Sequence, residues 1–129
     1  MGNSYLQGVA HVNLTIEEGP QAFEVARRFY VDILGLELLP RPENIDNGRP
    51  GLWLQCGPQQ VHISAEPNAT QLNGKSGRHA AFVVSNLAAL HNRLQENGTL
   101  LQVANQFEGQ QRFFCRDEWG NRIEFVQFN

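Results

Sequence analysis

The sequence has few cysteines, little excess charge and no long apolar run, and each absence excludes a class of protein. Its two cysteines, Cys56 and Cys115, lie in separate apolar segments. They match neither a disulfide framework nor a zinc spacing, so we expect two buried free thiols in a reducing compartment. No apolar stretch reaches the about 20 residues that span a bilayer, and the N-terminus has no charged region followed by an apolar one. We therefore expect a cytoplasmic protein.

The charge balance argues against polyanionic partners. The 129 residues carry a formal net charge of -3 without a basic cluster, so neither nucleic acid nor an anionic membrane surface is an expected partner. With 41% hydrophobic and 18% charged residues, the composition is that of an ordered protein. The length predicts one domain over residues 1–129.

The order of predicted elements occurs twice along the chain. Alternating apolar residues predict strands, and apolar residues at helical spacing between Gly19-Pro20 and Gly35 predict a first helix. Ser85 or Asn86 is the expected N-cap of a second helix that Gly98 ends. The predicted elements are a strand at 9–15, a helix at 20–34, strands at 36–39, 52–56 and 60–64, then a strand at 79–84, a helix at 87–97 and strands at 100–103, 111–115 and 122–128.

Each half of the chain is thus a βαβββ module. Module one covers about 8–65 and module two about 78–129, and the segment 66–77, rich in Asn, Gly, Ser and Pro, is the expected linker. The predicted fold class is α+β, with paired βαβββ modules whose two curved sheets face each other.

Four side chains that can bind a transition metal fall at equivalent strand positions of the two modules. His11 and His79 lie in the first strand of their halves, and His62 and Glu124 lie in the last. Imidazole and carboxylate are typical ligands of a divalent ion, and metal sites are normally built from residues far apart in sequence. The strand alternation places all four opposite the main apolar sets. The sequence therefore predicts a metal site at His11, His62, His79 and Glu124.

Plainer interpretations remain for single residues. A lone strand histidine is usually solvent-facing or hydrogen-bonded, and His91, among leucines of the second helix, is expected at the helix surface or at its boundary with the core. The stretch 116–121 is expected to form a tight turn before the last strand. Trp53 and Trp119 are first packing residues and second, with Phe114, candidates for lining a pocket.

Four segments resemble the vicinal oxygen chelate superfamily, which groups glyoxalases, bleomycin-resistance proteins and extradiol dioxygenases, over essentially the whole chain. They are VAHVNL at 9–14, FYVDILGLEL at 29–38, RHAAFVV at 78–84 and DEWGNRIEF at 117–125. The resemblance implies paired βαβββ modules around a cavity, often in a homodimer that assembles its sites from both chains. It also implies that His11, His79 and Glu124 are metal ligands.

The chain departs from the family pattern at two places. His62 stands where glyoxalase-type members have a Glu or Gln ligand, which still offers a donor, and Glu118 stands where Pro is common. No recognisable glutathione-binding arginine pattern accompanies these segments.

Two functions follow from these patterns. In the first, a divalent ion (Zn, Ni, Co, Mn or Fe) binds two oxygens of a small oxygenated substrate for lyase, isomerase or dioxygenase chemistry, with Glu124 or His62 as catalytic base. In the second, the same fold is a non-catalytic small-molecule or drug-binding protein, with Trp53, Phe114 and Trp119 lining the cavity. The sequence selects neither the substrate nor the reaction.

Overall fold

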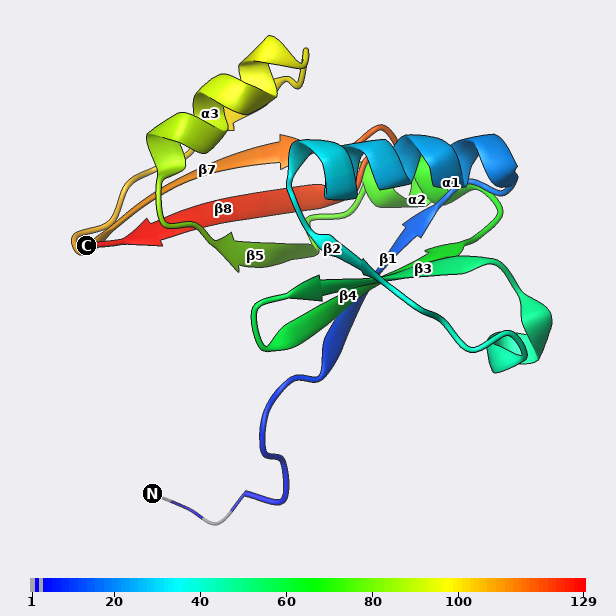
Figure 1. Ribbon diagram of the computed structural model, residues 1–129. Coiled ribbons are helices and arrows are strands. Elements are labelled where there is room, and N and C mark those ends of the chain that lie inside the picture. The colour runs from blue at the N-terminus through cyan, green and yellow to red at the C-terminus, as the bar shows by residue number, and fades with distance from the viewer. Residues whose placement is uncertain (1, 3) are drawn as a thin grey trace.

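The computed structural model describes residue 2 and residues 4–129. Met1 and Asn3, which belong to the N-terminal segment without a targeting pattern, lie outside the described residues. The chain forms two four-stranded sheets with helices packed against them (Figure 1). The elements are β1 (His11–Ile16), α1 (Pro20–Arg27), η1 (Arg28–Ile33), β2 (Glu37–Leu39), η2 (Ile45–Gly48), β3 (Gly51–Cys56), β4 (Gln59–Ala65), α2 (Ala69–Gly74), β5 (His79–Val83), α3 (Leu87–Glu96), β6 (Leu101–Val103), β7 (Gln110–Arg116) and β8 (Arg122–Phe128).

The two sheets have the same topology, which confirms the predicted pair of βαβββ modules. The strand order is β1-β4-β3-β2 in the first sheet and β5-β8-β7-β6 in the second. In each, the first strand pairs in parallel with the last, and the remaining pairs are antiparallel. The parallel pair is possible because a helical crossover separates its strands in each module.

One face of each sheet contributes to a single hydrophobic core. Alternate residues of the strands point inward, as the period of two requires, and pack with the helices. Tyr30 of η1 and Leu94 of α3 are both fully buried in this core, so it spans the two modules. The strand residues of this core are Leu14, Ile16, Leu54, Val61, Ile63, Phe113, Cys115, Ile123 and Phe125. The opposite, outer faces of the sheets carry most of the polar alternates, together with the buried Phe114 and Val126 on the second sheet.

A buried polar network centred on Asp117 joins the two modules. Tyr30 Oη donates to Asp117 Oδ2 at 2.7 Å, across 87 residues of sequence. Asn121 Nδ2 donates both to that oxygen, at 2.9 Å, and to the Thr15 carbonyl of β1, at 2.8 Å. The backbone N–H groups of Trp119 and Asn121 donate to Asp117 Oδ1. The turn before β8 is therefore bonded to both η1 and β1 of the first module.

The segment that joins the modules contains a helix that its composition did not indicate. Residues 69–74 form α2, entered through Asn68 in the left-handed region at φ 62°. Asn73 is buried, and its amide donates to the carbonyls of Thr15 at 2.9 Å and Trp119 at 3.1 Å. These two long-range bonds, which no local pattern reveals, hold the segment against the rest of the protein.

The first helix also differs from its prediction. It is α-helical to Arg27 and then widens into a π-helical segment, in which the Leu34 N–H donates to the Phe29 carbonyl at 2.9 Å. Gly35 follows at φ 84°, as expected of a residue that ends a helix. For the second helix, Asn86 is the N-cap, since its side chain accepts a bond from the Ala89 N–H.

Both cysteines have free thiols, as predicted. Cys115 is fully buried and Cys56 is partly buried. Burial raises the pKa of the Cys115 thiol to about 12, with Asp117 contributing. Among the described residues, no helix is both long and apolar enough to cross a membrane.

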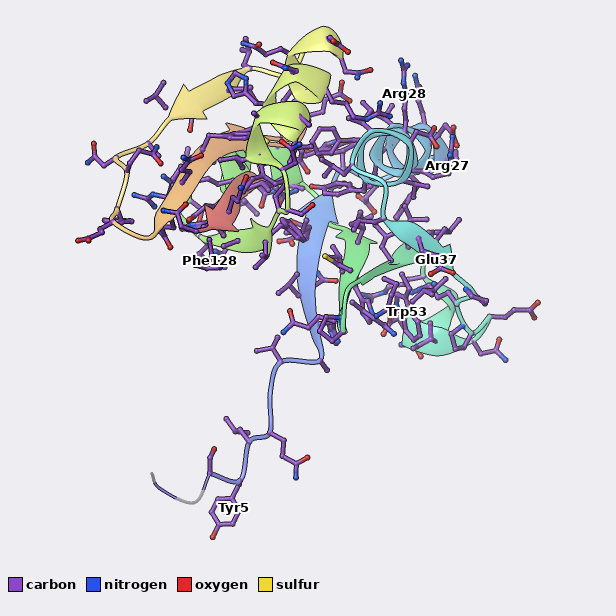
Figure 2. The ribbon with its side chains drawn as sticks, turned by 60° about the vertical axis from the view of Figure 1, so that its left-hand side comes forward. Tyr5, Arg27, Arg28, Glu37, Trp53 and Phe128 are labelled. Atoms are coloured by element: carbon purple, nitrogen blue, oxygen red, sulfur yellow. The ribbon has the colours of Figure 1, made fainter. Side chains whose placement is uncertain are left out.

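Replacing Tyr30 with Phe should destabilise the protein by about 1 to 3 kcal/mol, because the buried Asp117 carboxyl loses one hydrogen-bond donor without a replacement. The free energy of unfolding from urea titration measures the effect. Tyr5→Phe is the matched control, since Tyr5 is fully exposed on the extended N-terminal segment (Figure 2). Equal stability of the two variants would contradict a role for the Tyr30–Asp117 bond.

Candidate metal centre

The first donor pair lies on the outer face of the β1-β4-β3-β2 sheet. The rings of His11 and His62 stack, with centroids 3.9 Å apart and planes 15° from parallel. Trp53 of β3 stacks on the other side of His62, at 4.6 Å and 8°. His62 Nε2 also lies 2.8 Å from Gln60 Oε1. The imidazole of His62 is thus held between two rings and fixed at its edge by an amide.

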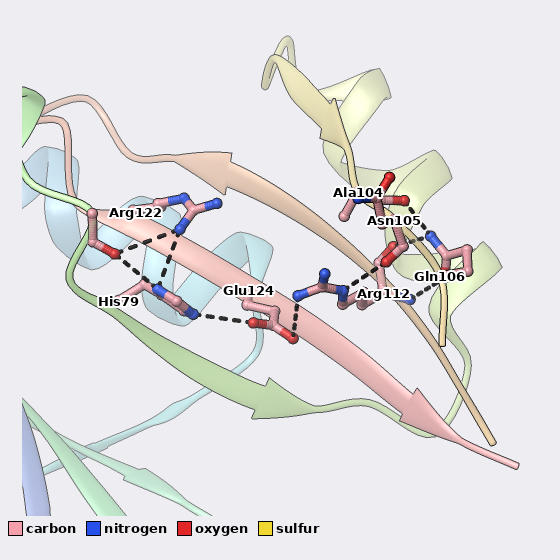
Figure 3. A network of polar contacts seen from close by, with 8 residues as sticks. His79, Ala104, Asn105, Gln106, Arg112, Arg122 and Glu124 are labelled. Atoms are coloured by element: carbon pink, nitrogen blue, oxygen red, sulfur yellow. Dashed lines mark hydrogen bonds and ion pairs between the residues drawn. The ribbon is translucent and has the colours of Figure 1, made fainter. Parts of the chain in front are cut away.

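The second pair lies on the outer face of the β5-β8-β7-β6 sheet (Figure 3). His79 Nε2 is 3.1 Å from Glu124 Oε1, and the Arg112 guanidinium lies 3.7 Å from the other carboxylate oxygen. Glu124 is 8% exposed. The ring of Phe114 meets that of His79 edge to face at 5.3 Å. A largely buried carboxylate and an imidazole are therefore in direct contact.

The two pairs are built in the same strand register. In the parallel pairing of β1 with β4, His62 lies opposite Asn13, two residues after His11. In the pairing of β5 with β8, Glu124 lies opposite Ala81, two residues after His79. Residues two apart share a face, so each module brings its two donors together by the same geometry.

Both nitrogens of His79 face hydrogen-bond acceptors. Nδ1 lies 3.0 Å from the Gly77 carbonyl, and Nε2 faces the Glu124 carboxylate. A neutral imidazole has only one N–H, so whichever nitrogen carries it, the other nitrogen would direct its lone pair at an acceptor. An imidazolium ion satisfies this arrangement, and so does a cation bound by Nε2 and the carboxylate together.

Within one chain the two pairs do not combine. Among residue 2 and residues 4–129, no group of three or more His, Cys, Asp or Glu side chains is close enough to hold one metal ion. Each sheet instead presents two donors on its own outer face. An ion with three or four protein ligands would have to draw on both faces.

The comparisons with known proteins bear on the whole chain. Residues 8–125 match the family model described as Glyoxalase/Bleomycin resistance protein/Dioxygenase superfamily. The chain belongs to this superfamily. The comparison with curated proteins finds no match.

Solved structures agree with this membership. A protein from Bacillus anthracis described as a glyoxalase family member is 33% identical, with 99% of this chain and 100% of that one covered and a TM-score of 0.85. TnmS3, an antibiotic binding protein from Streptomyces sp. CB03234, is 19% identical over 98% of this chain and 100% of its own, at 0.72. FosX, a fosfomycin resistance protein of Listeria monocytogenes solved with Mn(II) and sulfate, is 12% identical over 96% and 92%, at 0.75. The last two show the fold alone.

The three residues predicted to line a pocket lie in two different places. Trp53 and Phe114 contact the candidate ligands, whereas Trp119 is 5% exposed and packs in the hydrophobic core. Trp119 lies two residues after Asp117 in the same buried turn, and its backbone N–H donates to the Asp117 carboxylate. The structure thus supports its first interpretation, as a packing residue. His91 is half-buried on α3, with its ring against Phe113.

Three neighbours of the donor pairs were not predicted as site residues. Gln60 and Arg122 stand two residues before His62 and Glu124, so the strand period that placed the ligands also places them on the same faces. Examining the position two residues before each candidate ligand would have found both Gln60 and Arg122. Arg112 comes from a different strand, β7, and its contact with Glu124 depends on a pairing register that the sequence does not specify.

We predict that His62 titrates at a lower pH than an ordinary histidine in the metal-free protein. Burial, helped by His11 and Arg41, lowers the pKa of His62 below 6.5. The folded protein therefore binds this proton less readily than the unfolded chain, so the stability linked to His62 is present above pH 6.5 and is lost as the pH falls through the lowered pKa. NMR titration of the imidazole C–H signals, assigned with His62→Gln, measures it. Trp53→Leu, which uncovers His62, should bring the pKa back toward 6.5; a His62 pKa at or above 6.5 in the parent protein would refute the assignment.

Proposed function

We propose that the protein is a metal-dependent enzyme in which His11, His62, His79 and Glu124 hold one divalent ion that binds a small oxygenated substrate. The observation that carries the proposal is the 3.1 Å contact between His79 Nε2 and the largely buried Glu124 carboxylate, which brings two possible metal ligands together on one sheet face. The 3.0 Å approach of His79 Nδ1 to the Gly77 carbonyl supports it, since metal-bound histidines commonly donate their other N–H to such a group.

The second pair fits a metal in separation as well as in chemistry. With bonds of about 2.1 Å, neighbouring ligand atoms on an ion lie about 3.0 Å apart at right angles and about 3.4 Å apart in a tetrahedron. The His79–Glu124 distance of 3.1 Å falls in this interval. The first pair has suitable ligand types but not a suitable arrangement. The rings of His11 and His62 are stacked, so their nitrogen lone pairs lie in parallel planes, and one of the rings has to turn for both to reach one ion.

The separation of the pairs supports a homodimer with shared sites. Each chain offers one pair per sheet, so a second copy that faces His11 and His62 with its own His79 and Glu124 would complete a set of four. Apolar side chains continue the outer face around the second pair: Val83 is 72% and Phe128 58% exposed, and both share the face of the donors on β5 and β8. A partner chain would cover them.

The bound ion would act as a Lewis acid on two neighbouring substrate oxygens. The chain's own residues do the rest. Glu124 is the proposed base at a carbon next to a carbonyl, because Arg112 and His79 contact its two oxygens and position the carboxylate on the outer face of the second sheet. His62 is the alternative base from the first module. Phe114 and Trp53 would border the substrate and exclude water. Two free thiols support a reducing, cytoplasmic location.

A second candidate function is metal-free binding of a planar small molecule. The parallel stack of Trp53, His62 and His11 favours it, because the exposed ring of His11 ends the stack and offers a flat aromatic surface. The antibiotic-binding neighbour TnmS3 has the same fold. This function gives no role to the common register that brings His79 and Glu124 together as it does His11 and His62, so it ranks second.

Substituting His79 with Ala should abolish stoichiometric metal binding, whereas His91→Ala, which removes the imidazole on α3 outside the pairs, should leave it intact. The measurement is elemental analysis after dialysis against Zn, Ni, Co, Mn or Fe in turn, with isothermal titration for the ions that bind. A parent protein that takes up none of these ions, or a His79→Ala variant that binds as well as the parent, would favour the binding-protein function.

Mixing two inactive variants tests whether the site is shared between chains. His11→Ala and His79→Ala should each lose metal binding alone. In a mixed dimer, one site would carry both substitutions and the other would carry none. Co-refolding the variants at equal amounts should therefore restore about one quarter of the parent metal content, because half of the dimers are mixed and each has one intact site. No restoration in a proven mixed dimer would place each site within one chain.

A further inference from the structure

We propose that the substrate is an anion and that Arg122 binds its carboxylate or phosphate group in the cavity beside His79. This inference rests on the proposed function and names the substrate class of the same site. It begins with the charge of the outer face of the second sheet. That face carries Arg112, Arg116 and Arg122 against the single acid Glu124, a formal charge of +2 on a chain whose net charge is -3.

Two of these arginines already have strong partners. Arg116 donates to three backbone carbonyls, those of Asn73, Ser76 and Gly120, at 2.8 to 3.2 Å. Arg112 donates to the Asn105 carbonyl at 2.9 Å and lies 3.7 Å from the Glu124 carboxylate. Both guanidinium groups are thus engaged in holding loops or the carboxylate.

Arg122 differs from them. Its polar contacts are a 3.5 Å bond to the Gly77 carbonyl and a 3.5 Å approach to His79 Nδ1, and no carboxylate of the described residues lies within 4.0 Å of it. Its guanidinium instead lies over the ring of Phe114, with its central carbon 3.9 Å from the ring centroid. This cation–π contact holds the guanidinium without a carboxylate, so its N–H groups are available to a two-oxygen partner.

A cavity of about 530 Å³ lies next to this group. Its lining includes β1 residues on one side and His79 and Arg122 on the other. The charged lining is completed by Arg78 and Glu66, and neither forms an ion pair within the described residues. A ligand anion in this cavity would give Arg122 the partner it lacks and would lie beside the His79–Glu124 pair. Oxygens of the same molecule could then reach the metal.

The test uses binding rather than turnover. The full-length protein, metal-free and zinc-loaded, is titrated with pyruvate, inorganic phosphate and the neutral ester methyl pyruvate, followed by calorimetry and by the NMR signals of the arginine Nε–H groups. Pyruvate or phosphate should bind saturably and shift the Arg122 signal, and Arg122→Gln should raise the Kd at least tenfold. Whichever acid binds more tightly identifies the group as carboxylate or phosphate. Arg28→Gln, on the exposed side of η1 (Figure 2), should leave binding unchanged.

Several results would overturn the inference. These are saturable binding of neither acid, equal Kd values for Arg122→Gln and the parent, or a methyl pyruvate affinity that falls as much as that of pyruvate. Arg122→Lys separates charge from geometry, since it keeps the charge and loses the flat two-oxygen fork. Zinc binding is measured separately on each variant: if zinc binds and the acids do not depend on Arg122, this inference alone fails. If the acids depend on Arg122 and none of Zn, Ni, Co, Mn and Fe binds, the metal-dependent function fails instead.

Discussion

The buried carboxyl of Asp117 is the interaction on which the relative placement of the two modules depends. It accepts bonds from Tyr30 of η1, from Asn121 and from two backbone N–H groups of its own turn. Burial raises the pKa of Asp117 and the bonds from Tyr30 and Asn121 oppose the rise, so their geometry decides how much the buried group costs. Because Asn121 also bonds to Thr15, the same turn fixes β1 and β8, the strands that carry His11 and Glu124.

That arrangement explains which parts of the fold the sequence could predict. The alternation of apolar and polar residues is local and clear in β1 and β4, and the element order repeats in both halves of the chain, so the paired modules followed from these two signals. The common register, with Asn13 opposite His62 and Ala81 opposite Glu124, then brings each pair together without further information. The fold prediction succeeded because the strand period of two, present in both halves of the chain, was sufficient to identify the modules.

The prediction was incomplete where one residue both shapes a local turn and forms long-range hydrogen bonds. Asp117 and Asn121 have a sufficient local explanation as turn residues, and that explanation concealed their bonds to Tyr30 and Thr15. Asn73 has the same property, since a polar segment with Asn and Gly indicates a linker whether or not its amide is buried. The grouping of the four candidate ligands into two pairs was also hidden, because the placement of one sheet against the other depends on these long-range bonds.

The two donor pairs differ in charge, so the two sides of the proposed metal site differ in charge as well. The first pair is two imidazoles, and burial lowers the pKa of one of them, His62, which stacks on Trp53. The second is an imidazole and a carboxylate beside arginines. Three neutral imidazoles and one carboxylate would leave a divalent ion with a net charge of about +1. An anionic substrate would therefore be attracted by the ion as well as by Arg122, and only the attraction to Arg122 acts from the side of the second sheet. The charged end of the substrate would then lie toward that sheet.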